Sequence, residues 1–411
     1  MTLASHAPNL TRRRLAGWSL LLALPAALPA AAQKRYDTGA SDTEIRIGQT
    51  MPYSGPVSML GTVGRAASAY FDKLNAEGGI QGRKVKLVSL DDGYSPPKAL
   101  EQTRRLVEQE EVLLMFGTVG SATNQAVHKY LNCRKVPQLL ILSGASRWND
   151  PKGHPWTLSG MFSYEAEGRV YARHMLANNR QPRIAILAQT DDFGRDYVRG
   201  LKAELGERAK TLIVAETTYE ATDPTVDSQL VSLKESGANV FMNFSTGKFT
   251  AQAIRRAADL GWKPQIYLPL GSSAIASILQ PAGLERSVGA LTIANQKNPL
   301  DPQWAQDAGM KAYFDFMKRW APTLEAQDSL NVSGYGLAMI LAEVLRRCGD
   351  TLTRDNVLRQ MLSLKDFSTP VMLPGVSVST GLDDYELYAT ARLQRFDGKS
   401  WVPFGDPVNS R

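Results

Sequence analysis

Residues 84–109 read KVKLVSLDDGYSPPKALEQTRRLVEQ, and this stretch indicates the fold class. The apolar run over 84–90 predicts a strand, the DDGYSPP segment predicts a turn, and the two prolines predict the first turn of an amphipathic helix. The same strand-then-helix order precedes it in residues 44–79 and follows it in residues 112–135. Alternating strands and helices predict an α/β fold with mainly parallel sheets and helices on both faces.

The alternation begins again farther along the chain. RIAILAQTDDFG at 183–194, ANVFMNFSTG at 238–247 and QIYLPLGSS at 265–273 each read as a strand that ends in small and hydroxylated residues. Ligands of open parallel sheets collect at the carboxyl ends of the strands. We therefore expect a second α/β unit, with two such sheet edges facing each other across a cleft that encloses a small molecule.

The first 32 residues read as an export signal. TRRRLAG at 11–17 precedes the short apolar run WSLLLALPAALPAAA at 18–32, which ends in small residues. Thr11–Leu15 resembles the twin-arginine export motif, and a Sec signal has an equally basic start. The residues beyond this segment contain no window of about 18 apolar residues. No cysteine follows the expected cleavage point, so we expect a periplasmic protein without a lipid anchor.

Charge and motifs argue against several function classes. The formal charge is +7, but Arg12–Arg14 lie in the export segment, so the rest carries 44 basic (47 less 3) against 40 acidic side chains. This balance gives no reason to expect a nucleic-acid partner. The sequence contains no P-loop, GxGxxG or GxSxG motif and only four histidines, so we expect no enzyme activity, cofactor or metal site.

Several side chains have two readings. Arg147 beside Trp148, and His154 beside Trp156, are weak pocket candidates; a solvated arginine and a histidine packed under an aromatic ring are the alternatives. The two cysteines, Cys133 and Cys348, are equally compatible with a disulfide and with free thiols.

From residue 47 onward the chain resembles the type I periplasmic solute-binding proteins of ABC importers, in the Leu/Ile/Val-binding group. The matching stretches are residues 54–99, 135–146, 183–196 and 253–273, in order. The resemblance implies two Rossmann-like lobes, 43–162 with 293–371 and 163–292 with 372–411, joined by three crossovers near residues 160–164, 290–296 and 370–374. It also implies a monomer that closes on its ligand and delivers it to an inner-membrane permease.

The same resemblance gives Asp91 and Asp92 a structural role. In that family such a pair ends the second strand, accepts backbone N–H bonds and caps the next helix. A shared metal ion is the less favoured reading, because adjacent side chains of an extended segment point to opposite sides.

The resemblance also implies a set of ligand-binding residues. Gly120, Ser121, Ala145 and Ser146 would hold a ligand carboxylate. Leu60, Phe193, Thr246 and Leu270 would replace the polar or aromatic groups of the amino-acid receptors, and Gly271 is the glycine that follows position 270 there as well. Leu270 stands where those receptors have the glutamate that binds an ammonium group. An alignment shift there would bring Gln265 or Ser272 to the site instead.

These replacements predict an apolar cleft with Tyr164 nearby, along with Tyr53 and Phe162. We expect a benzoate- or cinnamate-like acid first, a fatty or dicarboxylic acid second and a branched-chain amino acid third, which places the chain beside the aromatic-acid receptors. A ligand-sensing module of a signalling system and an exported α/β hydrolase are the alternative functions; the hydrolase lacks a nucleophile elbow.

Overall fold

The computed structural model describes residues 34–410 together with Met1, Thr2, Ala4 and Ala7. Residues from Arg35 onward form one compact unit. The predicted export signal, including Arg12–Arg14, lies outside the described residues apart from those four positions. No helix in the described part of the chain is long and apolar enough to cross a membrane.

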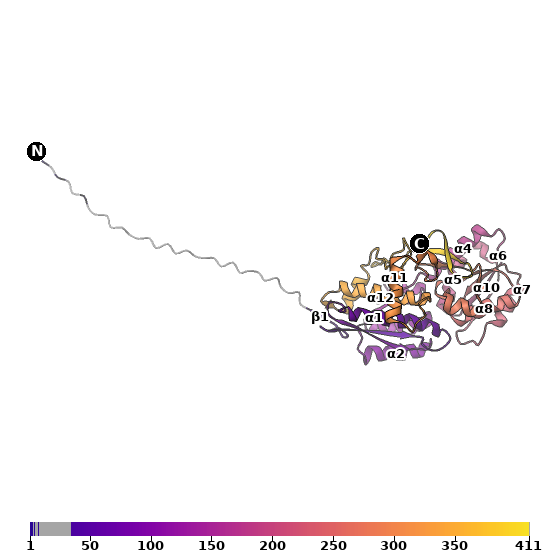
Figure 1. The fold of residues 1–411 in the computed structure, drawn as a ribbon, viewed down its shortest axis with the longest axis horizontal. Coiled ribbons are helices and arrows are strands. Elements are labelled where there is room, and N and C mark those ends of the chain that lie inside the picture. Colours follow the sequence, from indigo (N-terminus) through magenta and orange to yellow (C-terminus); the bar gives the residue numbers. More distant parts are fainter. Residues whose placement is uncertain (3, 5–6, 8–33, 411) are drawn as a thin grey trace. The chain divides into compact units, whose positions relative to one another are not determined.

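The first sheet has five strands, all parallel, in the order β3-β2-β4-β5-β6. They are β2(Glu44–Met51), β3(Lys84–Asp91), β4(Leu114–Phe116), β5(Gln138–Ile141) and β6(Thr157–Ser159). The connecting helices are α1(Gly61–Ala76), α2(Pro96–Glu108) and α3(Ser121–Cys133). Figure 1 shows α1 and α2 on opposite faces of this sheet, and α12(Ser329–Arg347) packs on α1. The predicted turn at DDGYSPP lies between β3 and α2.

The second sheet has seven strands in the order β14-β13-β11-β10-β9-β7-β8. Five are parallel: β7(Ile184–Gln189), β8(Ile213–Tyr219), β9(Val240–Phe244), β10(Gln265–Tyr267) and β11(Leu291–Ala294). β13(Thr390–Phe396) and β14(Trp401–Asn409) form an antiparallel hairpin that pairs with β11, the last of the parallel strands. The helices of this part include α4(Tyr164–Asn178), α5(Asp192–Leu205), α7(Asp227–Glu235) and α8(Lys248–Asp259).

Shorter elements complete the described chain. They are β1(Arg35–Tyr36) with β12(Thr351–Leu352), the helices α6(Ala209–Leu212), α9(Gln280–Ala282), α10(Leu284–Ser287), α11(Ala308–Trp320) and α13(Arg354–Met361), the 3-10 turns η1(Ser58–Leu60), η2(Ser146–Trp148), η3(Gly206–Arg208), η4(Leu270–Ser272) and η6(Pro302–Trp304), and the π-helical turn η5(Ile275–Leu279).

The chain passes between the two sheets three times, as predicted. It crosses between β6 and α4, returns between β11 and α11, and crosses again between α13 and β13. β11 continues to Ala294 within the second sheet, two residues beyond the predicted lobe limit at 292. The strands β4, β5 and β9 are buried along their whole length, which explains their near-continuous apolar runs.

The two cysteines are free thiols, so the structure selects one of the two alternatives. Cys133 is exposed at the end of α3, and Cys348 is buried directly after α12. Burial raises the pKa of the Cys348 thiol to about 12, so the thiol stays protonated at neutral pH and is unreactive.

Candidate functional site

A cavity of about 130 Å³ lies where loops at the carboxyl ends of strands from both sheets meet. The first sheet contributes the loop from β4 to α3, which contains Gly120 and Ser121. The second sheet contributes Thr246 after β9 and the η4 turn after β10. Other lining residues come from the turn after β3, the loops after β5 and β6, the starts of α4 and α5, η1, α1, α12, the crossover after β11 and the C-terminal hairpin. The cavity is thus built from both sheets at the edge predicted for ligand binding.

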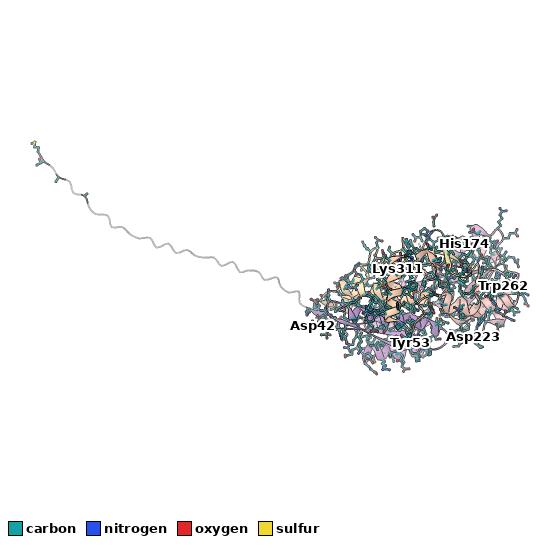
Figure 2. The ribbon with its side chains drawn as sticks, in the orientation of Figure 1. Asp42, Tyr53, His174, Asp223, Trp262 and Lys311 are labelled. Atoms are coloured by element: carbon teal, nitrogen blue, oxygen red, sulfur yellow. The ribbon has the colours of Figure 1, made fainter. Side chains whose placement is uncertain are left out.

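Eight of the ten predicted site residues line this cavity: Leu60, Gly120, Ser121, Tyr164, Phe193, Thr246, Leu270 and Gly271. Of the two positions that an alignment shift would have brought in, Ser272 lines the cavity and Gln265 does not. Tyr53, labelled in Figure 2, is outside the lining, and its hydroxyl oxygen lies 2.6 Å from Ser89 Oγ.

Ala145 and Ser146 do not line the cavity, in contrast to the prediction. The backbone N–H of Ser146 donates to Asp196 at 2.6 Å, and its hydroxyl oxygen accepts from Arg199 at 2.7 Å. Asp196 and Arg199 both belong to α5. They hydrogen-bond to the N–H and hydroxyl groups of Ser146 predicted to hold a carboxylate. Arg147, the pocket candidate in η2, is likewise paired with Asp192 of α5. Neither Arg147 nor Ser146 lines the cavity.

The first sheet contributes polar groups to the cavity at the start of α3. Gly120 has φ +96°, and an added Cβ would meet Tyr94 Cε2 at 2.5 Å, so only glycine fits this position without displacement. Ser121 Oγ lies 2.8 Å from Ser143 Oγ, which also accepts the indole N–H of Trp148 at 2.8 Å. When Ser143 donates to Ser121, the Ser121 proton is available to an acceptor at the helix N-terminus, where a negative charge is favoured.

One wall of the cavity is aromatic. The rings of Tyr164 and Phe193 meet edge to face with centroids 5.0 Å apart, and Tyr164 stacks on Tyr197 at 4.8 Å. Tyr197 in turn stacks on Phe244 of β9 at 4.8 Å. This continuous aromatic layer holds Tyr164 and Phe193 rigid, and it offers ring faces and edges to a ligand.

A buried carboxylate supports this wall from behind. Glu167 accepts hydrogen bonds from the hydroxyls of Tyr197 (2.6 Å) and Tyr171 and from the backbone N–H of Leu270 (2.6 Å). Burial raises the pKa of Glu167 to about 7, although the three hydrogen bonds act in the opposite direction. Glu167 is absent from the lining, so it holds the η4 turn rather than contacting the cavity.

Asp91 and Asp92 shape the turn that leads to Tyr94. Asp91 accepts the backbone N–H groups of Ser54 and Gly93 and the ammonium of Lys98, at 2.7–3.0 Å. Asp92 accepts the backbone N–H of Tyr94 at 2.8 Å. The predicted backbone hydrogen bonds are therefore present. The predicted helix cap is not, because the N-cap of α2 is Ser95 and no side chain caps that end.

The pKa values of the Asp91 and Asp92 carboxyl groups are shifted in opposite directions. Burial raises the pKa of Asp92 to about 6. Burial acts in the same sense on Asp91, but the hydrogen bonds from Lys98, Ser54 and Gly93 outweigh it and hold the pKa of that group below its usual range. The described residues include no group of three or more acidic, His or Cys side chains that could hold a metal ion.

Tyr94 is the main site residue that sequence reasoning missed. Its backbone has φ +61°, which is unusual for a large side chain, and its ring packs over Gly120. A second, wider cavity of about 810 Å³ lies beside the first, and among the described residues Tyr94 alone lines both. Its hydroxyl accepts a long hydrogen bond (3.4 Å) from Gln189 of β7. Tyr94 therefore stands between the two cavities and links the two sheets.

Other missed lining residues come from distant segments: Gln296 and Lys297 after β11, Tyr388 before β13 and Trp401 at the start of β14. Lys297 brings a cation to the lining, but its ammonium is 2.8 Å from both Asp307 Oδ1 and the Pro370 carbonyl oxygen. That charge is already balanced. The sequence marks these positions only as irregular connections.

The His154 and Trp156 candidates lie away from the cavity. His154 Nε2 lies 3.0 Å from His128 Nε2, and His154 Nδ1 lies 3.1 Å from Asp150. This cluster packs on Trp148 and joins α3 to the loop before β6.

Three comparisons place this geometry among known proteins. The family model described as "Periplasmic binding protein" matches residues 44–399. A Leu/Ile/Val-binding protein homolog 7 from Brucella suis is 23% identical over 239 residues, and this match covers 56% of the present chain and 59% of that protein.

Two solved structures share the fold. A branched-chain amino acid ABC transporter protein from Thermus thermophilus with bound valine matches with a TM-score of 0.78 at 16% identity, over 90% of this chain and 97% of that one. A solute-binding protein from R. palustris in complex with benzoate matches with a TM-score of 0.75 at 20% identity, over 89% and 96%. The two sheets, the three crossovers and the matched family model agree, and the chain belongs to the periplasmic binding protein family with the type I fold.

Proposed function

We propose that the protein is an exported solute-binding protein that carries a small organic carboxylate with an aromatic ring to an ABC permease. The observation that carries this proposal is the composition of the cavity lining. Among the described residues that line it there is no aspartate or glutamate, and the one cation, Lys297, is already paired. A buried ammonium group would have no counter-charge in such a site.

The lining favours a ring in place of an amino group. Tyr164, Phe193, Leu60 and Leu270 supply apolar surface, and the hydroxyl of Ser121 with the start of α3 supplies donors for a carboxylate. A volume of about 130 Å³ is close to the roughly 150 Å³ of an engineered apolar cavity that holds benzene. The R. palustris neighbour, whose structure is a complex with benzoate, supports the same class.

A branched-chain amino acid is the second candidate. It is supported by the valine-bound Thermus thermophilus neighbour and by the name of the Brucella relative. In this case the backbone carbonyls and the side-chain oxygens of the lining would have to bind the ammonium group without a carboxylate.

Isothermal titration calorimetry with benzoate, octanoate and leucine on one protein sample distinguishes the candidates. We expect tight binding of benzoate, weak binding of octanoate and no heat with leucine. Leucine binding with no heat from either acid would refute the proposal. Delivery to a permease, the periplasmic location and a monomeric state belong to the same proposal; cell fractionation and size-exclusion chromatography of the mature protein test the last two.

A further inference from the structure

One hydroxyl group in the cavity lining has no partner. Ser272 ends the η4 turn, its residue is 0% exposed, and its Oγ atom makes no hydrogen bond within the described part of the chain. Ser272 is also part of the cavity lining. A buried hydroxyl without a partner is costly, so it requires an explanation.

The other polar groups of this turn are satisfied. The backbone N–H of Ser272 donates to the Pro269 carbonyl at 2.8 Å, and the hydroxyl of Ser273 donates to the Leu270 carbonyl at 2.8 Å. The Leu270 N–H donates to Glu167, as described above. The turn is thus held by its own hydrogen bonds, and the Ser272 hydroxyl is not needed to fold it.

Ser272 and Ser121 both belong to the cavity lining, but they come from different sheets. Ser121 begins α3 of the first sheet, whereas Ser272 follows β10 of the second sheet. A ligand whose carboxylate lies at Ser121 therefore presents another part of its body to Ser272. A bare ring there would leave the hydroxyl unpaired, whereas a polar ring substituent would pair it.

We propose that Ser272 hydrogen-bonds to a second polar atom of the ligand, and that the preferred ligand is an aromatic acid with a hydroxyl group on its ring. This inference rests on the proposed function and narrows its substrate class. A site that pairs a ligand hydroxyl discriminates strongly against the analogue that lacks it, because the protein group is then left unpaired.

The test compares benzoate with 3-hydroxybenzoate and 4-hydroxybenzoate by calorimetric titration of the full mature chain. We expect the wild-type protein to bind one hydroxylated acid at least about 10-fold more tightly than benzoate. Ser272→Ala should reduce this preference to about 2-fold or less while benzoate affinity stays within about 3-fold of wild type. The measured quantity is the ratio of the two dissociation constants.

Ser273→Ala is the matched control, because it removes a hydroxyl from the same turn and the same lining that already has a partner. It should change the affinity for both acids alike and leave their ratio unchanged. Thermal melting without ligand gives an independent readout: Ser272→Ala should be as stable as wild type or more stable, since it deletes an unpaired buried group.

The outcomes distinguish failure of the inference about Ser272 from failure of the proposed function. Equal affinity for benzoate and both hydroxylated acids, or a preference that persists in Ser272→Ala, overturns this inference and leaves the proposed function standing. Binding of none of the three acids by a folded wild-type protein overturns the proposed function itself.

Discussion

The backbone N–H of Leu270 donates to Glu167 Oε1 at 2.6 Å, which fixes the η4 turn of the second sheet to helix α4. The resemblance to the amino-acid receptors predicts a leucine in place of an ammonium-binding glutamate at position 270. The structure adds that the carboxylate of Glu167 accepts a backbone hydrogen bond from this turn and does not line the cavity.

Replacing Glu167 with glutamine should remove a pH dependence of stability. The folded-state pKa is raised to about 7 from an ordinary 4.5, so the folded protein binds more protons than the unfolded chain between these values. Stability from this group is therefore lost as pH rises from about 4.5 to about 7, by an amount on the order of 3 kcal/mol. Urea unfolding across this range should show that loss in the wild-type protein and a smaller one in Glu167→Gln.

The glutamine variant is expected to fold, because its Oε1 can still accept from Leu270 and Tyr171 while its amide donates to the Tyr197 hydroxyl. Glu101→Gln, at an exposed position of α2, is the control and should leave the slope of the wild-type protein unchanged. If the free energy of unfolding depends on pH equally in wild type and in Glu167→Gln, Glu167 does not have a raised pKa in the folded protein.

Tyr94 should control ligand retention, because its ring separates the inner cavity from the wider one. Tyr94→Ala should weaken ligand binding by roughly 10–100-fold through loss of apolar contact and of the barrier to water. Tyr94→Phe keeps the ring and loses only the 3.4 Å bond from Gln189, so it should bind within about 3-fold of wild type. Stopped-flow dissociation rates measure the difference; equally slow release from Tyr94→Ala and wild type would argue against a partition.

Gly120→Ala should damage the site more than its backbone strain alone explains. The new Cβ would lie 2.5 Å from Tyr94 Cε2 and 2.7 Å from Thr123 Oγ1, in addition to the cost of φ +96° for a residue with a side chain. Gly78→Ala is a matched control, with φ +105° and no atom within 4 Å of the added Cβ.

Both variants should lose roughly 1 kcal/mol or more of stability through backbone strain. Only Gly120→Ala should also weaken ligand binding by about 10-fold or more, because it displaces the Tyr94 ring. Chemical unfolding and calorimetry on the same samples separate the two effects. Unchanged ligand affinity in Gly120→Ala would show that ligand binding does not depend on the position of the Tyr94 ring.

His128 should produce a pH dependence of the opposite sign to that of Glu167. Burial lowers the pKa of His128, and the nearby His154, Arg147 and Lys129 act in the same direction. The folded protein then binds fewer protons than the unfolded chain, so stability is lost as pH falls below the ordinary histidine value of about 6.5.

His128→Gln should remove this loss, and urea unfolding between pH 5 and pH 8 should show the change as a flatter acid limb. A variant with the same acid limb as wild type would mean that the pKa of His128 is the same in the folded and unfolded states.

Local patterns predicted most of the strands and helices, and the resemblance to a known family predicted much of the site. The inner strands of a parallel sheet are buried on both faces, and a covering helix shows one apolar stripe, so short windows of sequence are enough to identify them. Gly120 and Ser121 could be placed in the site because the loop that contains them resembles the anion-binding turn of the solute-binding proteins.

The sequence by itself determined the α/β alternation, since each strand and helix depends on neighbours within one short segment. The three crossovers and the eight correctly placed lining residues came from the resemblance of the sequence to a known family. Only the tertiary structure decided that Ser146 bonds to α5 instead of facing the cavity, that Tyr94 covers Gly120, and that Trp401 joins the lining. These contacts join segments far apart in the chain. They depend on strand order and on the direction of single side chains, which local periodicity does not encode.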